Sequence, residues 1–138
     1  MISVRRTLLS VLSVWHGLAA FKNVCDLAAA FGVVPAAARW RSHNLAAMEK
    51  LLLPLRLPRP LLGTLLAGAA AVEAVAAVAF ALDEDELAFT LATALFGAFA
   101  LVDEAMADYE LDQTHREVLV FVLTAYLVTR RNEPRQAD

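Results

Sequence analysis

Cysteine is nearly absent from this chain, and its one occurrence, Cys25, excludes an intramolecular disulfide, a CxxC redox pair and a thiolate metal site. Lysine is also scarce, occurring only at Lys22 and Lys50. No basic patch interleaved with aromatic residues exists, so nucleic acid is not an expected partner. Glycine-rich phosphate loops, nucleophile elbows and HExxH motifs are missing too. We therefore do not expect the chain to be catalytic alone.

Apolar residues are what the chain has in excess. They make up 59% of its 138 residues, and the mean hydropathy is +0.56. Soluble domains use about 45–50% apolar residues, and a soluble protein this small has too much surface to hide a larger share. We therefore expect the lipid bilayer to be its solvent and the cytoplasmic membrane to be its location.

Four apolar blocks predict an all-α fold, an integral membrane four-helix bundle in a single domain. The clearest block covers residues 61–82, which is long enough for a crossing of ~20 residues. The other three blocks cover residues 7–34, 87–102 and 117–130. The last block is short for a crossing, so the alternative is three spans plus one short packed or interfacial helix.

A basic loop over residues 35–60 separates the first two blocks. Within it, residues 45–53 carry leucines on one side and Glu49 and Lys50 on the other, which is typical of a helix lying in the membrane interface. Three prolines, the last of them Pro60, then break the helix, and we expect the next helix to begin after them. The arginines divide too evenly between the two sides for the positive-inside rule to fix an orientation.

Small residues recur at every fourth position of the second block, at Gly63, Ala67 and Ala71. Such residues allow membrane helices to approach one another closely. We interpret them as packing positions inside one small bundle. The alternative is a face that forms a homo-oligomer.

Polar residues in the first block fall on one side of the expected helix. At about 100° per residue, they lie within an arc of roughly 120°, and they are His16, Lys22, Asn23 and Asp26. The i, i+4 spacing of Lys22 and Asp26 predicts a salt bridge. An ionised side chain at the bilayer centre costs about 3 kcal/mol. The stripe should therefore face the bundle interior, a cavity or a partner.

Three acidic residues outside the first block extend this predicted polar cluster. Glu73 lies near the middle of the clearest block, and Asp103 and Glu104 could close the cluster from one membrane edge. Two interpretations remain open. The groups could satisfy one another and fix the helix register, or they could form a site for a quinone headgroup, a small polar ligand or a proton path.

Metal and haem are not expected from the histidines. A bis-histidine haem needs two histidines on facing helices inside a bundle, and only His16 lies well inside an apolar block. Asp112 and His115 have the i, i+3 spacing of a carboxylate–histidine iron motif. Such iron sites need that motif twice.

A run of short motifs in the first half of the chain carries a family resemblance. The residues are G-L-A-A-F-K over 17–22, then Asp26, then F-G-V-V-P over 31–35, with Glu73 in the next block. This pattern resembles the DoxX-like family of small four-helix membrane proteins, although the family's G-x-P is spread here to G-V-V-P. The second half matches only by hydropathy. The resemblance implies a membrane subunit attached to oxidoreductase systems, such as thiosulfate:quinone or thiol-linked complexes.

The resemblance also implies a buried polar cluster at Lys22, Asp26 and Glu73. Our leading hypothesis is an accessory or anchoring membrane subunit of a quinone-linked oxidoreductase complex, with quinone as cofactor and a redox protein subunit as partner. One alternative is a small proton-coupled transporter or carrier that uses His16 together with these three residues. A structural or assembly protein without its own ligand is the other alternative.

Overall fold

The computed structural model describes residues 3–35, 40–106 and 109–131, and the side chains of residues 109–112 are left out of the description. Residues 36–39 of the basic loop thus lie outside the described residues. In the described part every regular element is helical, which confirms the expected all-α class. The elements are α1 (Val4–Ala30), α2 (Asn44–Leu51), a short 3-10 helix η1 (Leu53–Leu55), α3 (Arg59–Ala81), α4 (Asp85–Met106) and α5 (Tyr109–Arg131).

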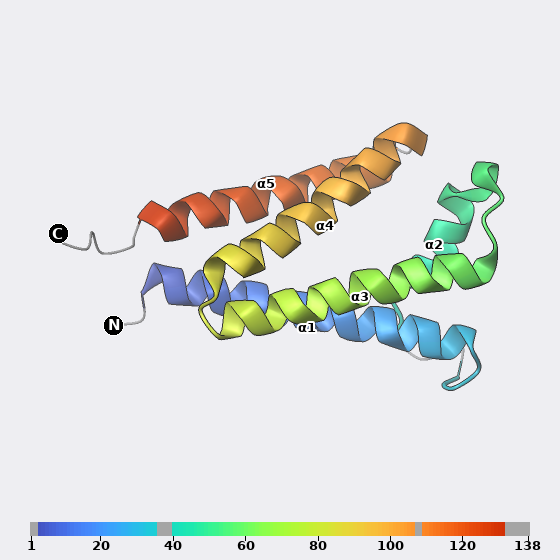
Figure 1. Ribbon diagram of the computed structural model, residues 1–138, viewed down its shortest axis with the longest axis horizontal. Coiled ribbons are helices and arrows are strands. Elements are labelled where there is room, and N and C mark those ends of the chain that lie inside the picture. The colour runs from blue at the N-terminus through green and yellow to red at the C-terminus, as the bar shows by residue number, and fades with distance from the viewer. Residues whose placement is uncertain (1–2, 36–39, 107–108, 132–138) are drawn as a thin grey trace.

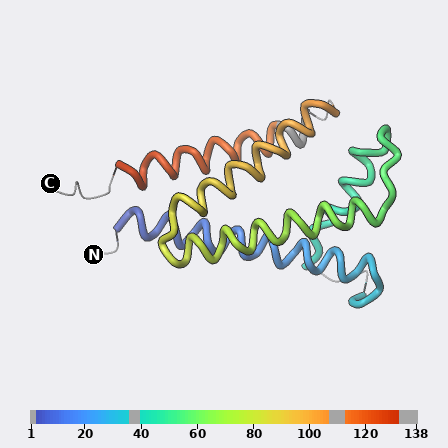
Figure 2. The backbone as a smooth tube through the Cα atoms, in the orientation of Figure 1, coloured from blue at the N-terminus to red at the C-terminus, as the bar shows by residue number. Residues whose placement is uncertain are grey.

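Four long helices run antiparallel to their chain neighbours (Figure 1). Helix α1 packs along α3, and α4 packs along α5, so the molecule consists of two helix pairs (Figure 2). The start of α1, the α3–α4 turn and the end of α5 lie at one end of the molecule. Helix α2 lies at the opposite end, where the α4–α5 pair diverges from α1 and α3.

Local sequence signals set the helix ends. Ser3 caps α1, because its side-chain oxygen accepts a hydrogen bond of 3.2 Å from the Arg6 backbone N–H. Gly32 follows the other end of α1 with a φ of 73°, a left-handed conformation that favours glycine. Helix α3 begins at Arg59, slightly earlier than expected, because Pro60 is tolerated in a first helical turn that needs no backbone N–H from it.

Three of the described helices, α1, α3 and α4, are long and apolar enough to cross a membrane. Large apolar side chains cover their outer faces, with Val14, Phe21 and Val75 all more than half exposed. Helix α5 has the length, but its opening turns are polar. Apolar side chains outside and polar side chains inside are typical of a protein that is solvated by lipid.

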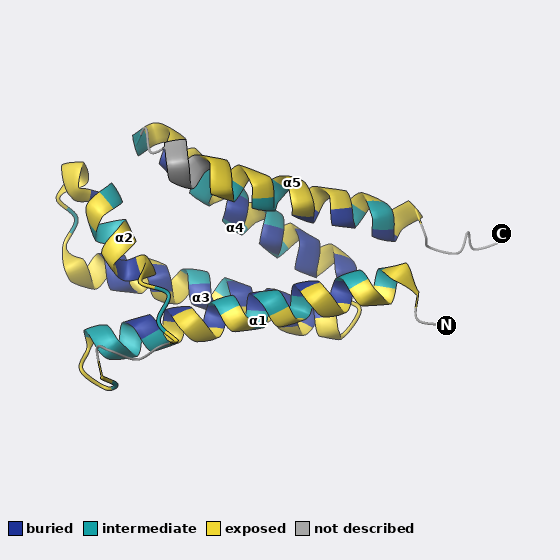
Figure 3. Cartoon of the chain, turned by 180° about the vertical axis from the view of Figure 1, so that it is seen from behind, coloured by how far each residue is buried: buried dark blue, intermediate teal, exposed yellow. Residues whose placement is uncertain are grey.

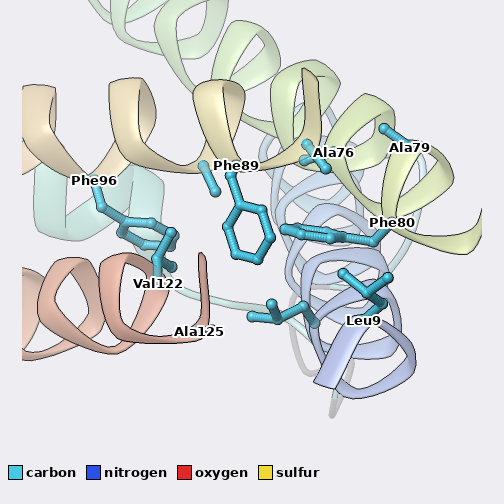
Figure 4. Close-up of a cluster of buried hydrophobic side chains, with 11 residues drawn as sticks. Leu9, Ala76, Ala79, Phe80, Phe89, Phe96, Val122 and Ala125 are labelled. Atoms are coloured by element: carbon cyan, nitrogen blue, oxygen red, sulfur yellow. The ribbon is translucent and has the colours of Figure 1, made fainter. Parts of the chain in front are cut away.

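The main core lies where all four long helices meet (Figure 4). Phe80 of α3 and Phe89 of α4 contact edge to face, with ring centroids 5.0 Å apart. Small residues such as Ala76 and Ala92 are fully buried there, which allows the helices to approach closely.

The small-residue stripe predicted for α3 is wrong at two of its three positions. Gly63 is buried against Leu27 and Phe31, but Ala67 and Ala71 are exposed. The buried face of α3 instead runs through Leu66, Ala70, Glu73 and Ala77. The homo-oligomer alternative stays a prediction.

Candidate functional site

The inner face of α1 carries buried polar side chains. His16, Asn23 and Asp26 are 1%, 4% and 0% exposed. Lys22, which we expected in the same stripe, is exposed. It lies at the edge of the predicted arc, about 100° around the helix from Asn23, and this angle turns it away from the bundle.

Asp26 is bound by the loop before α2 and not by Lys22. The Arg41 guanidinium lies 2.9 and 3.0 Å from Oδ1. Oδ2 accepts a hydrogen bond of 2.8 Å from the Leu45 backbone N–H, and one of 3.4 Å from the Ser42 hydroxyl. The expected Lys22–Asp26 salt bridge is therefore wrong, and this carboxylate instead attaches the first turn of α2 to α1.

A second polar group links three helices. Asn23 of α1 donates a 2.8 Å hydrogen bond from Nδ2 to Glu73 Oε2 of α3. Asn44, at the start of α2, donates a bond of the same length from its Nδ2 to Asn23 Oδ1. Glu73 is 5% exposed, so its carboxyl group is enclosed by protein and faces the inside of the bundle.

A third polar group joins α4 and α5. Asp103 is 2% exposed, and its Oδ2 is hydrogen-bonded to His115 Nδ1. The next residue on each helix forms a parallel pair on the outside, where Arg116 contacts Glu104 Oε2 at 2.6 Å. Glu104 is exposed, so its expected place in the buried cluster is wrong. One residue along a helix is a rotation of about 100°, which takes its side chain off the inner face.

His16 is enclosed by aromatic rings. Its ring centroid lies 5.6 Å from those of Trp15 and Phe80, and 5.9 Å from that of Phe96. Its Nε2 is buried and has no hydrogen-bond partner among the described residues. The single cluster expected from the sequence is thus divided into an Asp26 group, a Glu73 group, an Asp103 group and a separate histidine.

A cavity of about 390 Å³ brings two of these groups together. It lies mainly between α2, α3 and α4, at the end of the molecule where Figure 3 shows α2 standing beside the two diverging pairs. Asn23, Asn44 and Glu73 contribute to its wall, as do Asp103 and His115. The rest of the wall is apolar: Ala47, Met48, Leu51, Leu52, Leu65, Leu66, Ala69, Val72, Leu95, Phe96, Ala98, Phe99 and Val102.

The sequence analysis did not assign four residues to this site: Arg41, Ser42, Asn44 and His115, the last of which it considered only as half of an iron motif. Ser42 and Asn44 belong to a polar run directly before the leucine-rich segment, which is a recognisable helix-start signal. That signal predicts the start of α2 but not the partner of Asp26. His115 lies in a polar stretch, and only the pairing of α4 with α5 shows that its ring reaches a buried aspartate.

Among the described residues, no group of three or more His, Cys, Asp or Glu side chains is arranged to hold a metal ion. The side chain of Asp112, which we considered as half of an iron motif, lies outside the described residues. Comparison with known protein families, with characterised proteins and with solved structures finds no match for this chain.

Proposed function

We propose that the protein binds a small amphipathic molecule of the quinone class in the cavity between α2, α3 and α4. In this proposal it acts as an accessory membrane subunit of a quinone-linked oxidoreductase complex. The cavity carries the proposal, because it combines a largely apolar wall with two polar groups at defined places.

Size and chemistry support a ligand of this class. Ligand pockets in proteins commonly measure about 300–1,000 Å³ and have mostly apolar walls with a few polar groups that orient the ligand. The volume of about 390 Å³ suits one headgroup ring with a short apolar substituent. Phe96 and Phe99 offer aromatic surface to the ring, and Glu73 and His115 place hydrogen-bonding groups beside its oxygens.

The proposed location is the cytoplasmic membrane, with all four long helices crossing it. Helix α5 is the least apolar of them, yet it lies antiparallel along α4 and buries Val122 and Ala125 in the common core. Because its polar opening turns lie beside the polar end of α4, they would reach one membrane surface together. The α1 start and the α5 end would then meet the other surface.

The redox partner is proposed from the DoxX-like resemblance. That resemblance is carried by residues 17–22, Asp26, residues 31–35 and Glu73. Glu73 lies on the cavity wall, and Asp26 holds α2, which forms part of that wall, and this supports their carry-over. Lys22 is exposed, so the proposed site does not include it.

The first test is gentle extraction from the native membrane, followed by mass spectrometry of everything that accompanies the protein. We expect a bound quinone-class molecule and a redox subunit. The control compares two variants of α3: Ala69→Phe places a ring in the cavity, whereas Ala74→Phe places one on the exposed face. The small molecule should be lost from Ala69→Phe and kept by Ala74→Phe.

The results separate the two parts of the proposal. If the wild-type protein carries no such molecule, or if Ala69→Phe retains it fully, the cavity is not the binding site. If the molecule is present but no redox protein ever accompanies it, the subunit role fails and the binding role stands.

The carrier hypothesis is favoured by one further observation. Glu73 of α3 and Asp103 of α4 are buried carboxyl groups on the wall of the same cavity. Two acidic groups in such a place could exchange protons with a transported solute. Reconstituted vesicles should then show a proton-coupled flux that Glu73→Gln abolishes. Unchanged flux in the variant, or none in the wild type, would remove this hypothesis.

A further inference from the structure

The hydrogen-bonding state of His115 is determined by its neighbour. Asp103 is nearly fully buried, and its carboxylate can only accept a hydrogen bond, so the neutral His115 ring carries its proton on Nδ1. The other ring nitrogen, Nε2, then presents a lone pair. In the part of the chain that the structure describes, Nε2 has no hydrogen-bond partner, although the ring lines the cavity.

Neighbouring rings fix the orientation of this acceptor. The His115 ring centroid lies 5.0 Å from that of Phe99 and 6.4 Å from that of Phe96, and both phenylalanines also line the cavity. A ring that contacts two neighbouring rings and is bound at Nδ1 has little freedom to rotate. His115 therefore offers the cavity a hydrogen-bond acceptor in a set direction.

Glu73 supplies a hydrogen-bonding oxygen at the other polar group. Asn23 occupies Oε2, and within the described residues no hydrogen bond reaches Oε1. A buried carboxyl group can be ionised or neutral, so it can accept a hydrogen bond from a hydroxyl group or donate one to a carbonyl oxygen. At His115 Nε2, in contrast, an oxygen that carries no hydrogen would meet a lone pair, which leaves that acceptor unsatisfied. A hydroxyl group would satisfy Nε2 with its own hydrogen.

We propose that the cavity selects the reduced, dihydroxy form of a quinone-class ligand over the oxidised form, with one hydroxyl donating to His115 Nε2 and the other hydrogen-bonded to Glu73. The proposal rests on the function proposed above and names the form of the ligand that the same cavity takes. Asp103 is a positioning residue in it, because it acts through His115 and keeps the lone pair on Nε2.

The test uses a matched pair of probes, tetramethylhydroquinone and tetramethyl-1,4-benzoquinone, which have nearly the same size and shape. Calorimetric titration of the purified protein is carried out without oxygen and in the same detergent for both. We expect the hydroquinone to bind about tenfold more tightly, as one additional satisfied hydrogen bond implies.

Variants assign this preference to its residues. His115→Phe keeps a ring at the wall but removes the acceptor, and Asp103→Asn removes the charge that fixes the ring proton. Both should still bind the quinone while the ratio between the two affinities falls towards one. The ratio of the two affinities is measured within each variant. A variant that fails to fold is recognised because it binds neither probe.

Each remaining outcome overturns a defined claim. Equal affinities in the wild type, or tighter binding of the quinone, would overturn the selection and leave the cavity as a quinone-class site. A hydroquinone preference that survives in both His115→Phe and Asp103→Asn would overturn the assignment to this pair. Binding of neither probe by the wild type would overturn the selection and the proposed function together.

Discussion

Asp26 is the residue on which the placement of α2 depends. Its carboxylate is fully buried, and it binds the Arg41 guanidinium and the Leu45 backbone N–H. Removing one partner of a buried pair leaves an uncompensated charge, which costs about 3–5 kcal/mol. The loss of stability should appear first in α2, because Leu45 is in its first turn.

We therefore predict that Asp26→Ala accelerates amide hydrogen exchange in α2 at least tenfold and destabilises the protein by about 3 kcal/mol. The matched control is Lys22→Ala on the same helix, which should change stability by less than about 0.5 kcal/mol because the side chain is exposed. Mass-spectrometric hydrogen exchange checks both variants. Equal effects from the two would contradict the arrangement described for α1.

A double-mutant cycle identifies the partner of Asp26. Neutralising Arg41 and Asp26 together, as Arg41→Gln with Asp26→Asn, should cost less than the sum of the single changes, with a coupling of about 1–3 kcal/mol. The same cycle with Lys22→Gln should be additive, since Lys22 does not contact the carboxylate. Coupling to Lys22 and none to Arg41 would restore the pairing expected from sequence.

The sequence predicted only some of the residues of this site. Helical spacing placed His16, Asn23 and Asp26 on one face, because that argument depends only on the geometry of a single helix. It misplaced Lys22, at the edge of that arc, and Glu104, next to the buried Asp103, because a rotation of about 100° per residue separates inside from outside. It could not find Arg41 or His115, since their partners come from other elements.

At the scale of elements, α2 is attached by apolar contacts as well as by Asp26. Leu45 and Leu52 are buried against Leu62 and Leu66 of α3 in a cluster separate from the main core. Because this cluster is small and separate from the four-helix core, α2 can loosen without unfolding the long helices.

Leu45→Ala should therefore act locally. Truncating a buried leucine costs about 2–5 kcal/mol, and the loss should appear as faster proteolysis within residues 40–58 while the long helices stay protected. Leu53→Ala is the matched control, because Leu53 is 71% exposed. If the two variants are cleaved at the same rate, or if Leu45→Ala unfolds the whole chain, α2 is not an independently attached element.

Helix positions followed from the sequence more readily than helix ends did. Runs of apolar residues predicted the long helices, because burying or solvating such runs in lipid dominates their energetics. Helix α5 begins at Tyr109, well before its apolar block, because its polar opening turns pair with α4 through His115 and Arg116. Pairing between helices is not visible in hydropathy, and the cavity depends on it.

At the scale of the whole molecule, charges at one end link both ends of the described chain to the α3–α4 turn. Arg5 of α1 lies 2.8 Å from Asp85 and 3.4 Å from Asp83. Arg130 of α5 contacts Glu86. If all four long helices cross the membrane, these groups share one surface, and α2 faces the other.

Single-cysteine labelling tests this arrangement. In a Cys25→Ser background, cysteines introduced at Ser3, Glu84 and Arg131 should react with a membrane-impermeant maleimide from one side, and a cysteine at Lys50 from the other. The prediction follows because four crossings return the chain to the side where it began. Labelling of position 131 together with position 50 would instead establish three crossings.

The ion pairs at the α3–α4 turn also have a consequence for the order of events during biosynthesis. Arg5 is synthesised first, Asp85 and Glu86 follow much later, and Arg130 comes only with the final turn of α5. In a nascent chain halted before α5, Glu86 therefore has not yet met Arg130. Phe89 and Phe96 of α4 are also not yet packed against Val122 and Ala125. Completion of α5 closes the charge pair and the core together, so an unfinished chain differs chemically from a finished one.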